Sequence, residues 1–444
     1  MSSLPASCET LPGDDSGGLT APPAMHAALA SALGGNWLER ACRRMVHRQL
    51  EQLEHGRLLI VEDDKTTRFG RRGSLTATIR VHDPRFYRRL VTDGWRDACE
   101  AYVDGDCSSP DLPAVVRVMA RNRPLLASMA GRASRLLRAA HLANHWLRRN
   151  SRSGSRRNIS AHYDLGNDFF ALFLDRTMTY SCGVFERPGS TLEEASLAKY
   201  ERVCRKLQLR KSDHVLEVGG GWGGFAVYAA ENVGCRVTTT TISQEQFDFA
   251  RQRVEQAGLG DRVDILQKDY RDLEGQYDKL VSIEMIEAVG HAYLDTYFAA
   301  CCRLLKPDGM MLLQGITIPD DRFARYLHDV DFIKRHVFPG GDLPSLSSIA
   351  GSLHRATDFR ALHVEDLTPH YARTLACWRD RFWRRIGEVR RLGFDERFVR
   401  LWDLYLAYCE GGFEERQIGV AQYLLARPEN RRESVLGELA EACS

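Results

Sequence analysis

The chain has 444 residues, more than one ordinary hydrophobic core uses, so we expect a large domain with a smaller partner. Apolar residues make up 44% and charged residues 27%, the composition of a globular protein, and the formal net charge is only +2. No apolar run approaches the roughly 20 residues that span a bilayer. This composition argues against a membrane-spanning helix, and any membrane contact should be peripheral.

Residues 1–24 are rich in Ser, Gly, Pro and Ala and lack the basic start and apolar core of a signal peptide, which predicts a disordered tail and a cytoplasmic protein. Residues 25–120 predict a small α+β domain. Its expected strands are Arg57–Val61 and Leu75–Val81, and its expected helices are Pro84–Leu90, Trp95–Tyr102 and Leu112–Met119.

The predicted linker at residues 121–158 is strongly basic. From Arg121 to Arg157 it carries ten arginines and two histidines without one Asp or Glu, interleaved with leucines. This pattern favours a basic amphipathic helix that binds anionic phospholipid headgroups at the inner face of the membrane. A solvated helix packed on its own domain is an equal alternative. Trp146 is the one aromatic residue suited to stacking on bases, so no nucleic acid partner is expected.

Residues 159–430 alternate strands with helices, which predicts an α/β domain with a doubly wound, Rossmann-like sheet, followed by a tail at 431–444. The expected strands are His214–Val218, Arg236–Thr240, Val263–Leu266, Tyr277–Ile283 and Met310–Leu313. Aromatic residues between Thr374 and Leu425 predict two or three helices that cover this sheet.

A glycine-rich turn follows the first of these strands directly. Gly219, Gly221 and Gly223 let the backbone approach a nucleotide-like ligand at the carboxyl edge of the strand. Glu217 lies two positions before the first glycine, where its carboxylate can bind the cationic amino acid end of S-adenosylmethionine. Dinucleotide sites usually lack such a residue, so this position favours the methyl donor.

The next two strands end in polar residues that favour the same cofactor. The second runs into Thr241 and Ser243 without the carboxylate that NAD enzymes place about 20 residues beyond the glycines. The third is followed by Asp269 and Tyr270, a carboxylate and a ring suited to the amine and the face of adenine. The twelve cysteines contain no CxxC pair and no two histidines have ligand spacing, so no metal site is predicted.

Six motifs resemble the cyclopropane fatty-acyl-phospholipid synthase family, which includes the mycolic acid cyclopropane synthases. The resemblance extends from about Ile159 to about Leu425, and the first 120 residues more loosely resemble the lipid-binding-type domain of bacterial members. The motifs are His162–Phe170, Tyr180–Gly183, the turn EVGGGWGG, Thr241–Gln246, Asp269–Leu273 and Phe338–Gly341.

The resemblance implies roles for individual residues. Tyr180 and Ser181 would close over S-adenosylmethionine, the glycine turn would approach its methionine portion, and Gln246, Asp269 and Tyr270 would contact its adenosine portion. It also implies a bicarbonate ion in the active site. The residues that would hold that anion are Cys182, Glu287, the backbone around Ile316, and Tyr371.

Two departures from the family pattern bear on the product. Gln314 stands where the family commonly has His, and Gln can donate a hydrogen bond to an anion but cannot titrate. Ala288 stands in a second such position. Glu284 and Glu287 lie three residues apart at the start of a predicted helix, where carboxylates often only favour the helix N-terminus. Glu287 is the preferred catalytic candidate because it follows the fourth strand directly.

The expected reaction is methyl transfer to the double bond of an unsaturated acyl chain in a membrane phospholipid, followed by proton removal by bicarbonate to close a cyclopropane ring. One alternative is a C-methyltransferase that makes methyl-branched or methylene chains. Another is a lipid-binding homologue with altered catalysis. Expected partners are unsaturated phospholipid and a second copy of the chain in a homodimer.

Overall fold

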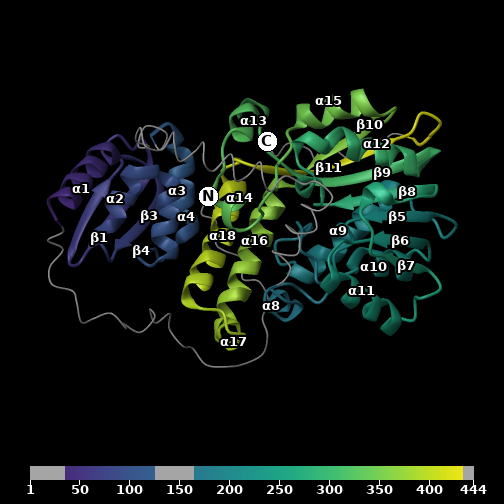
Figure 1. Cartoon of the computed structure of the whole chain (residues 1–444), viewed down its shortest axis with the longest axis horizontal. Helices are drawn as coiled ribbons and strands as arrows, with labels where there is room; N and C mark the ends of the chain where they lie inside the picture. Colours follow the sequence, from purple (N-terminus) through teal and green to yellow (C-terminus); the bar gives the residue numbers. More distant parts are fainter. Residues whose placement is uncertain (1–35, 126–164, 434–444) are drawn as a thin grey trace. The chain divides into compact units, whose positions relative to one another are not determined.

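The computed structural model describes residues 36–125 and 165–433, which fall into two compact units (Figure 1). The first unit draws on Met1–His141, Arg187–Thr191 and Leu375–Glu415, and the second on Leu142–Glu186, Leu192–Thr374 and Arg416–Ser444. The predicted tail at 1–24, the basic segment beyond residue 125 and most of the tail at 431–444 lie outside the described residues.

The first unit contains a four-stranded mixed sheet with the order β2-β1-β3-β4, in which β1 and β3 are parallel. This α+β arrangement and its predicted strands and helices are confirmed. The sheet consists of β1 (His55–Glu62), β2 (Lys65–Phe69), β3 (Arg72–Val81) and β4 (Cys107–Ser108). The helices are α1 (Trp37–Leu50), α2 (Arg85–Asp93), α3 (Trp95–Val103), α4 (Leu112–Arg121), α17 (Ile386–Arg391) and α18 (Glu396–Glu414).

Helix α1 was not predicted, although the sequence carries a start signal for it. The side chain of Asn36 accepts a hydrogen bond from the backbone N–H of Glu39, and the Glu39 carboxylate accepts one from the N–H of Asn36. This reciprocal pair satisfies two backbone donors that a helix start otherwise leaves unpaired. Asn followed three residues later by Glu is therefore the signal that could have located the helix.

The division into units differs from the predicted one. We expected residues 159–430 to form one domain, but α18 packs on α3 and α4 and belongs to the first unit. Its largely buried face, which includes Trp402 and Leu406, explains this position. Arg121, the first arginine of the predicted headgroup-binding segment, is held by Glu415 in the same unit at 2.7 and 2.8 Å.

An apolar cavity lies inside the first unit. Its volume is about 50 Å³, and its walls include Leu58, Ile79, Phe86, Val115 and Leu404. A cavity that binds benzene has roughly 150 Å³, so this space is too small for an acyl chain.

The second unit is built on a seven-stranded sheet with helices on both faces. Its strands are β5 (His214–Val218), β6 (Arg236–Thr240), β7 (Val263–Leu266), β8 (Tyr277–Ile283), β9 (Leu305–Thr317), β10 (Arg360–Asp366) and β11 (Gly419–Ala426). Its helices are α8 (Asn167–Ala171), α9 (Leu192–Leu207), α10 (Gly224–Asn232), α11 (Gln244–Gln256), α12 (Leu294–Leu304), α13 (Asp320–Leu327), α14 (Phe332–His336) and α15 (Leu346–Ala356), and α16 (Thr368–Arg384) begins here.

The strand order is β10-β11-β9-β8-β5-β6-β7. The five strands from β9 to β7 are parallel, which confirms the doubly wound sheet, and β11 runs antiparallel to β9. We expected helix up to Leu425, and this was wrong for Gly419–Ala426. The run is almost fully buried on both faces, so it has no alternation that would separate a strand from a buried helix.

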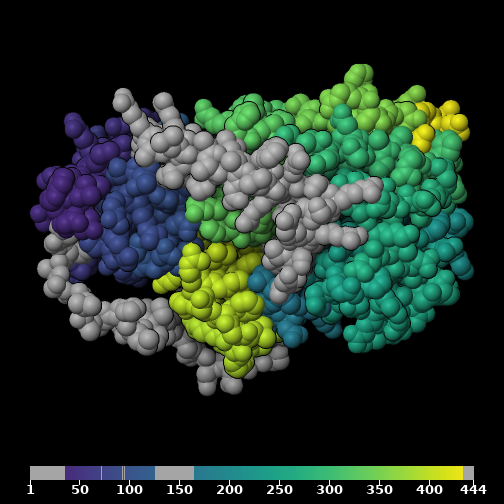
Figure 2. Space-filling model, in the orientation of Figure 1, coloured from purple at the N-terminus to yellow at the C-terminus, as the bar shows by residue number. Residues whose placement is uncertain are grey.

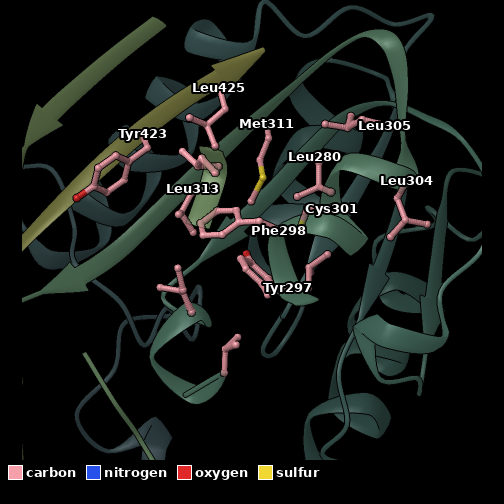
Figure 3. Packing of buried hydrophobic residues seen from close by; sticks show 14 of the residues in the cluster. Leu280, Tyr297, Phe298, Cys301, Leu304, Leu305, Met311, Leu313, Tyr423 and Leu425 are labelled. Carbon is pink, nitrogen blue, oxygen red and sulfur yellow. The ribbon is translucent and has the colours of Figure 1, made fainter. Parts of the chain in front are cut away.

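Alternate residues of the central strands enter two different cores. Leu216 and Met311 point into a core formed with α12 and α15, and Val215 and Met310 point into a core formed with α9, α10 and α11. Figure 3 shows the first core, where Tyr297 and Phe298 of α12 lie under the strands. In the space-filling view, the teal and green atoms of this unit are packed closely together (Figure 2).

Because β8, β5, β6 and β7 are parallel neighbours, the loops that follow them meet at one edge of the sheet. This edge carries the residues discussed next. In the two described stretches, no helix is long and apolar enough to cross a membrane.

Candidate active site

The glycine turn leaves β5 in a conformation that side chains rarely adopt. Gly219, Gly221 and Gly223 have φ values of +87°, +53° and +78°. The backbone N–H groups of Gly219 and Gly220 are bonded to the carbonyl of Thr240, which ties the turn to β6. A Cβ built on Gly221 meets no atom within 4 Å, so the turn borders open space where a ligand can approach the backbone.

Glu217 is buried at the carboxyl end of β5, with 3% of its surface exposed. Its Oε2 accepts a hydrogen bond of 2.6 Å from the Thr239 hydroxyl. Burial raises the pKa of Glu217 to about 7, although Thr239 and the ammonium of Lys199 both lower it. A buried carboxylate of this kind gains most from a cationic partner, so the site fits the amino acid end of S-adenosylmethionine.

Gly220 controls the position of Thr239. A Cβ at Gly220 would lie 1.9 Å from Thr239 Oγ1 and 2.9 Å from Glu217 Oε2. Gly220→Ala should therefore displace Thr239 and raise the dissociation constant for S-adenosylmethionine about tenfold, since crowding of this kind costs about 1–3 kcal/mol. Calorimetric titration measures the constant, with Gly260→Ala as a control because a Cβ there meets nothing within 4 Å. Equal affinities would contradict this account.

The other predicted cofactor residues lie after β6 and β7. Thr241 donates a 2.8 Å hydrogen bond to the Gln246 side chain, and Ser243 accepts from the Gln246 N–H at the start of α11. The Asp269 carboxylate accepts 2.8 and 2.6 Å bonds from the Arg271 guanidinium, a partner that the sequence interpretation missed. The structure therefore brings these residues to one edge of the sheet.

Tyr180, Ser181 and Tyr270 complete the predicted cofactor set. The Tyr180 ring lies edge-on to Phe170, with centroids 5.4 Å apart, and the Tyr270 ring packs edge-on against Tyr297 at the same separation. Ser181 accepts a 2.6 Å hydrogen bond from Lys199, a fully buried residue that sequence reasoning did not single out. Burial lowers the pKa of Lys199 to about 8.

Glu284 lies directly after β8 in the left-handed backbone region, with φ of +50°. Its carboxylate collects hydrogen bonds from residues that are far apart in the sequence. Oε1 accepts 2.8 Å bonds from the Cys182 N–H and from Gln314 Nε2, and Oε2 accepts a 2.6 Å bond from the Tyr371 hydroxyl. Glu284, which we had interpreted as a helix-start residue, is thus the centre of the polar cluster.

A second glutamine, which sequence reasoning missed, orients Gln314. Gln314 and Gln422 are paired residues of β9 and β11, and Gln422 Nε2 donates to Gln314 Oε1 at 2.9 Å. Lys206 in turn donates to Gln422 Oε1 at 2.8 Å. Because its oxygen is occupied in this way, Gln314 presents its NH₂ group to Glu284. The Gln314 NH₂ group is therefore held as a donor beside the Glu284 carboxylate.

Glu287 is the second carboxylate of the cluster. Its Oε1 accepts a hydrogen bond from the backbone N–H of Ile316, a donor that was expected to hold the anion. Its Oε2 is buried without a partner in the described part of the chain. Burial, followed by repulsion from Glu284, raises the pKa of Glu287 to about 8.

These contacts do not fit a bicarbonate ion held by Cys182, Glu287, the backbone of Ile316 and Tyr371. The Cys182 N–H and the Tyr371 hydroxyl already bind Glu284, and the Ile316 N–H already binds Glu287. The Cys182 thiol points elsewhere, toward the carbonyls of Gly183 and Leu367 at 3.2 and 3.8 Å. Burial holds the pKa of that thiol well above its usual value, so Cys182 acts through its backbone N–H. The expected anion site is therefore filled by a side chain.

Comparison with known proteins gives consistent matches. A family model described as mycolic acid cyclopropane synthetase matches residues 150–423. Tuberculostearic acid methyltransferase UfaA1 of Mycobacterium tuberculosis is 40% identical over 366 residues, which cover 78% of this chain and 82% of that protein. Cyclopropane-fatty-acyl-phospholipid synthase of Escherichia coli is 36% identical over 366 residues, covering 80% and 89%.

A solved structure agrees with these sequence matches. The crystal structure of mycolic acid cyclopropane synthase CmaA1 complexed with SAH and CTAB is 35% identical to this chain, with a TM-score of 0.58. The match covers 61% of this chain and 98% of that one.

Proposed function

The chain belongs to the mycolic acid cyclopropane synthetase family and is an S-adenosylmethionine-dependent methyltransferase of fatty acyl chains, and we propose that its substrate is the double bond of an unsaturated acyl chain in a membrane phospholipid. The observation that carries this proposal is the polar cluster around Glu284, placed after β8 beside the glycine turn of β5. This edge of the sheet combines a predicted site for the methyl donor with a carboxylate that can accept a proton.

S-adenosylmethionine supplies an electrophilic methyl group on a sulfonium when it is bound. The double bond is a weak nucleophile, so the protein must hold it in line with that methyl and exclude water. The π electrons form a new C–C bond while the S–CH₃ bond breaks, which leaves a cation on the acyl chain. A neighbouring carboxylate stabilises such a charge, and Glu284 is available for this purpose.

Loss of a proton from the cation gives one of two isomeric products. Removal from the new methyl group closes a cyclopropane ring, which is the first candidate and the product named for the E. coli relative. A methylene branch forms instead when a hydride first migrates from the methyl-bearing carbon to the cationic carbon. The methyl group then loses a proton, and its electron pair forms the double bond between the methyl carbon and the chain. The methyltransferase name of UfaA1, at higher identity over the same length, and the Gln at 314 favour the branched chain as the second candidate.

The test is turnover by the purified chain with labelled S-adenosylmethionine and vesicles of a monounsaturated phospholipid. The expected result is label in the acyl chain. Both products add one CH₂ unit, so mass alone does not separate them. Proton NMR distinguishes ring protons from vinyl protons, and ozone cleaves the methylene product but not the ring. Label that appears only in free fatty acid or in water-soluble products would contradict the phospholipid substrate.

The membrane partner is a separate part of the proposal. Anionic headgroups would attract the arginines between residues 121 and 157, each contributing about 1 kcal/mol near the surface. Vesicle sedimentation at rising salt concentration tests this contribution. Binding to anionic vesicles should weaken with salt, and equal binding to neutral vesicles would exclude a headgroup role.

A further inference from the structure

We propose that the carboxylate of Glu284, in place of a free bicarbonate ion, is the base that accepts the proton released after methyl transfer. This inference rests on the proposed function and adds a catalytic residue to it. It starts from a disagreement between the expected and the observed site. Two of the groups expected to hold an external anion, Cys182 and Tyr371, instead donate to the Glu284 carboxylate, and Gln314 donates to it as well.

The geometry leaves Glu284 able to accept a proton. The two oxygens of a carboxylate offer about four lone-pair positions. Among the described residues, Oε1 receives two hydrogen bonds and Oε2 receives one, from Tyr371. Oε2 therefore keeps a free position while the other three fix the orientation of the group. A base held in this way needs little reorganisation when the proton arrives.

The backbone of Glu284 gives an independent indication. A φ of +50° places the residue in the left-handed region, which is unfavourable for a residue with a side chain and costs glycine almost nothing. The chain carries a carboxylate here instead of glycine. Backbone strain of this kind is typical of functional sites, where the side chain's role outweighs its cost.

The surroundings of Glu284 also shift the pKa of its carboxyl group. Burial raises the pKa of Glu284, and the hydrogen bonds from Tyr371, Gln314 and Cys182 lower it, as does the ammonium of Lys199. The net effect is a carboxylate that is more basic than an exposed one. Repulsion between the two carboxylates, together with burial, also raises the pKa of Glu287, whose Oε1 is already bonded to the Ile316 N–H.

The proton transfer balances without another reagent. A C–H bond of the transferred methyl group breaks and the proton goes to Glu284 Oε2. The electron pair forms the ring bond to the cationic carbon or, once a hydride shift has moved the cation to the methyl-bearing carbon, the methylene double bond. The neutral carboxyl returns the proton to solvent after the product leaves. No oxidant, reductant or external base is consumed.

The first experiment measures bicarbonate binding without turnover. ¹³C-labelled bicarbonate is titrated by NMR into the wild-type chain, Glu284→Gly and Glu284→Gln. Glycine relaxes the backbone and leaves three donors around an empty space, so Glu284→Gly should bind the ion. The wild type and Glu284→Gln should not bind it. Specific binding by the wild type would overturn the proposal.

The second experiment measures turnover in buffer depleted of carbon dioxide, with and without added bicarbonate. Wild type and the control Glu255→Gln, which alters an exposed residue of α11, should work equally under both conditions. Glu284→Gln should lose about 10²- to 10⁴-fold, the usual contribution of a general base. Glu284→Gly should lose as much and recover partly when bicarbonate is added.

Two results would overturn the proposal: a wild-type rate that requires bicarbonate, or a Glu284→Gln variant with turnover close to wild type. Binding of S-adenosylmethionine by each variant, measured by calorimetry, shows that the site is folded. If even the wild type leaves phospholipid unlabelled, the proposed function fails, while the NMR titration still decides whether the site takes the free ion.

Discussion

Glu217→Gln is expected to weaken S-adenosylmethionine binding about 100-fold, since removing one member of a buried charge pair costs about 2–5 kcal/mol. The carboxylate is buried at the end of β5 and has only the Thr239 hydroxyl as a direct hydrogen-bond partner in the described residues. The amide keeps the size of the side chain but removes its charge. Calorimetric titration measures the loss, and Thr239→Val, which removes one neutral hydrogen bond, should cost about tenfold or less.

The same carboxylate predicts how cofactor binding depends on pH. Its pKa is raised to about 7 in the folded chain, so its contribution to stability is present at low pH and is lost as pH rises toward 7. The cationic cofactor binds the charged form, so affinity should increase as pH rises from 6 to 8. Glu217→Gln should flatten this increase. Affinity that is independent of pH in the wild type would show that the cofactor does not contact Glu217.

Asp403→Ala is expected to lower the free energy of unfolding by about 3–5 kcal/mol, the usual cost of removing one partner of a buried ion pair. Asp403 of α18 accepts hydrogen bonds of 2.7 Å from Tyr102 and 2.8 Å from both Arg379 and Trp383. All four residues belong to the first unit. The substitution leaves the guanidinium of Arg379 without its closest counter-ion.

Urea denaturation of the full chain measures this effect in the transition in which the first unit unfolds. Asp403→Asn is the matched variant, because it keeps the size of the side chain and should lose less. Asp380→Ala is a control in the same unit, since Asp380 pairs with Arg384 on a more exposed surface. A loss below about 1 kcal/mol for Asp403→Ala would show that the network adds little to stability.

The order of the strands in the sheet places the polar cluster around Glu284 next to the predicted cofactor site. The parallel strands β5 and β8 are neighbours, so Glu217 and Glu284, which lie at their carboxyl ends, face the same side of the unit. The antiparallel pair β9 and β11 places Gln422 beside Gln314 and so fixes the donor that faces Glu284. The prediction missed two strands of this sheet, β10 and β11, and β11 is the one that orients this donor.

The sequence by itself determined the elements that are specified by consecutive residues. The first four strands of the large sheet have the bounds that were predicted, because buried parallel strands are short apolar runs between turn residues. The glycine turn and Glu217 were identified for the same reason, since strand, carboxylate and turn are consecutive. These features justify the methyltransferase fold and the cofactor.

Only the tertiary structure decided the role of Glu284. Its three hydrogen-bond donors lie 102, 30 and 87 residues away in the sequence, and no local pattern records that they meet. A glutamate near a helix start has an ordinary explanation until those donors are seen around it. The membership of α18 in the first unit and the strand character of β11 depend on long-range packing in the same way, because a buried apolar segment does not specify which surface covers it.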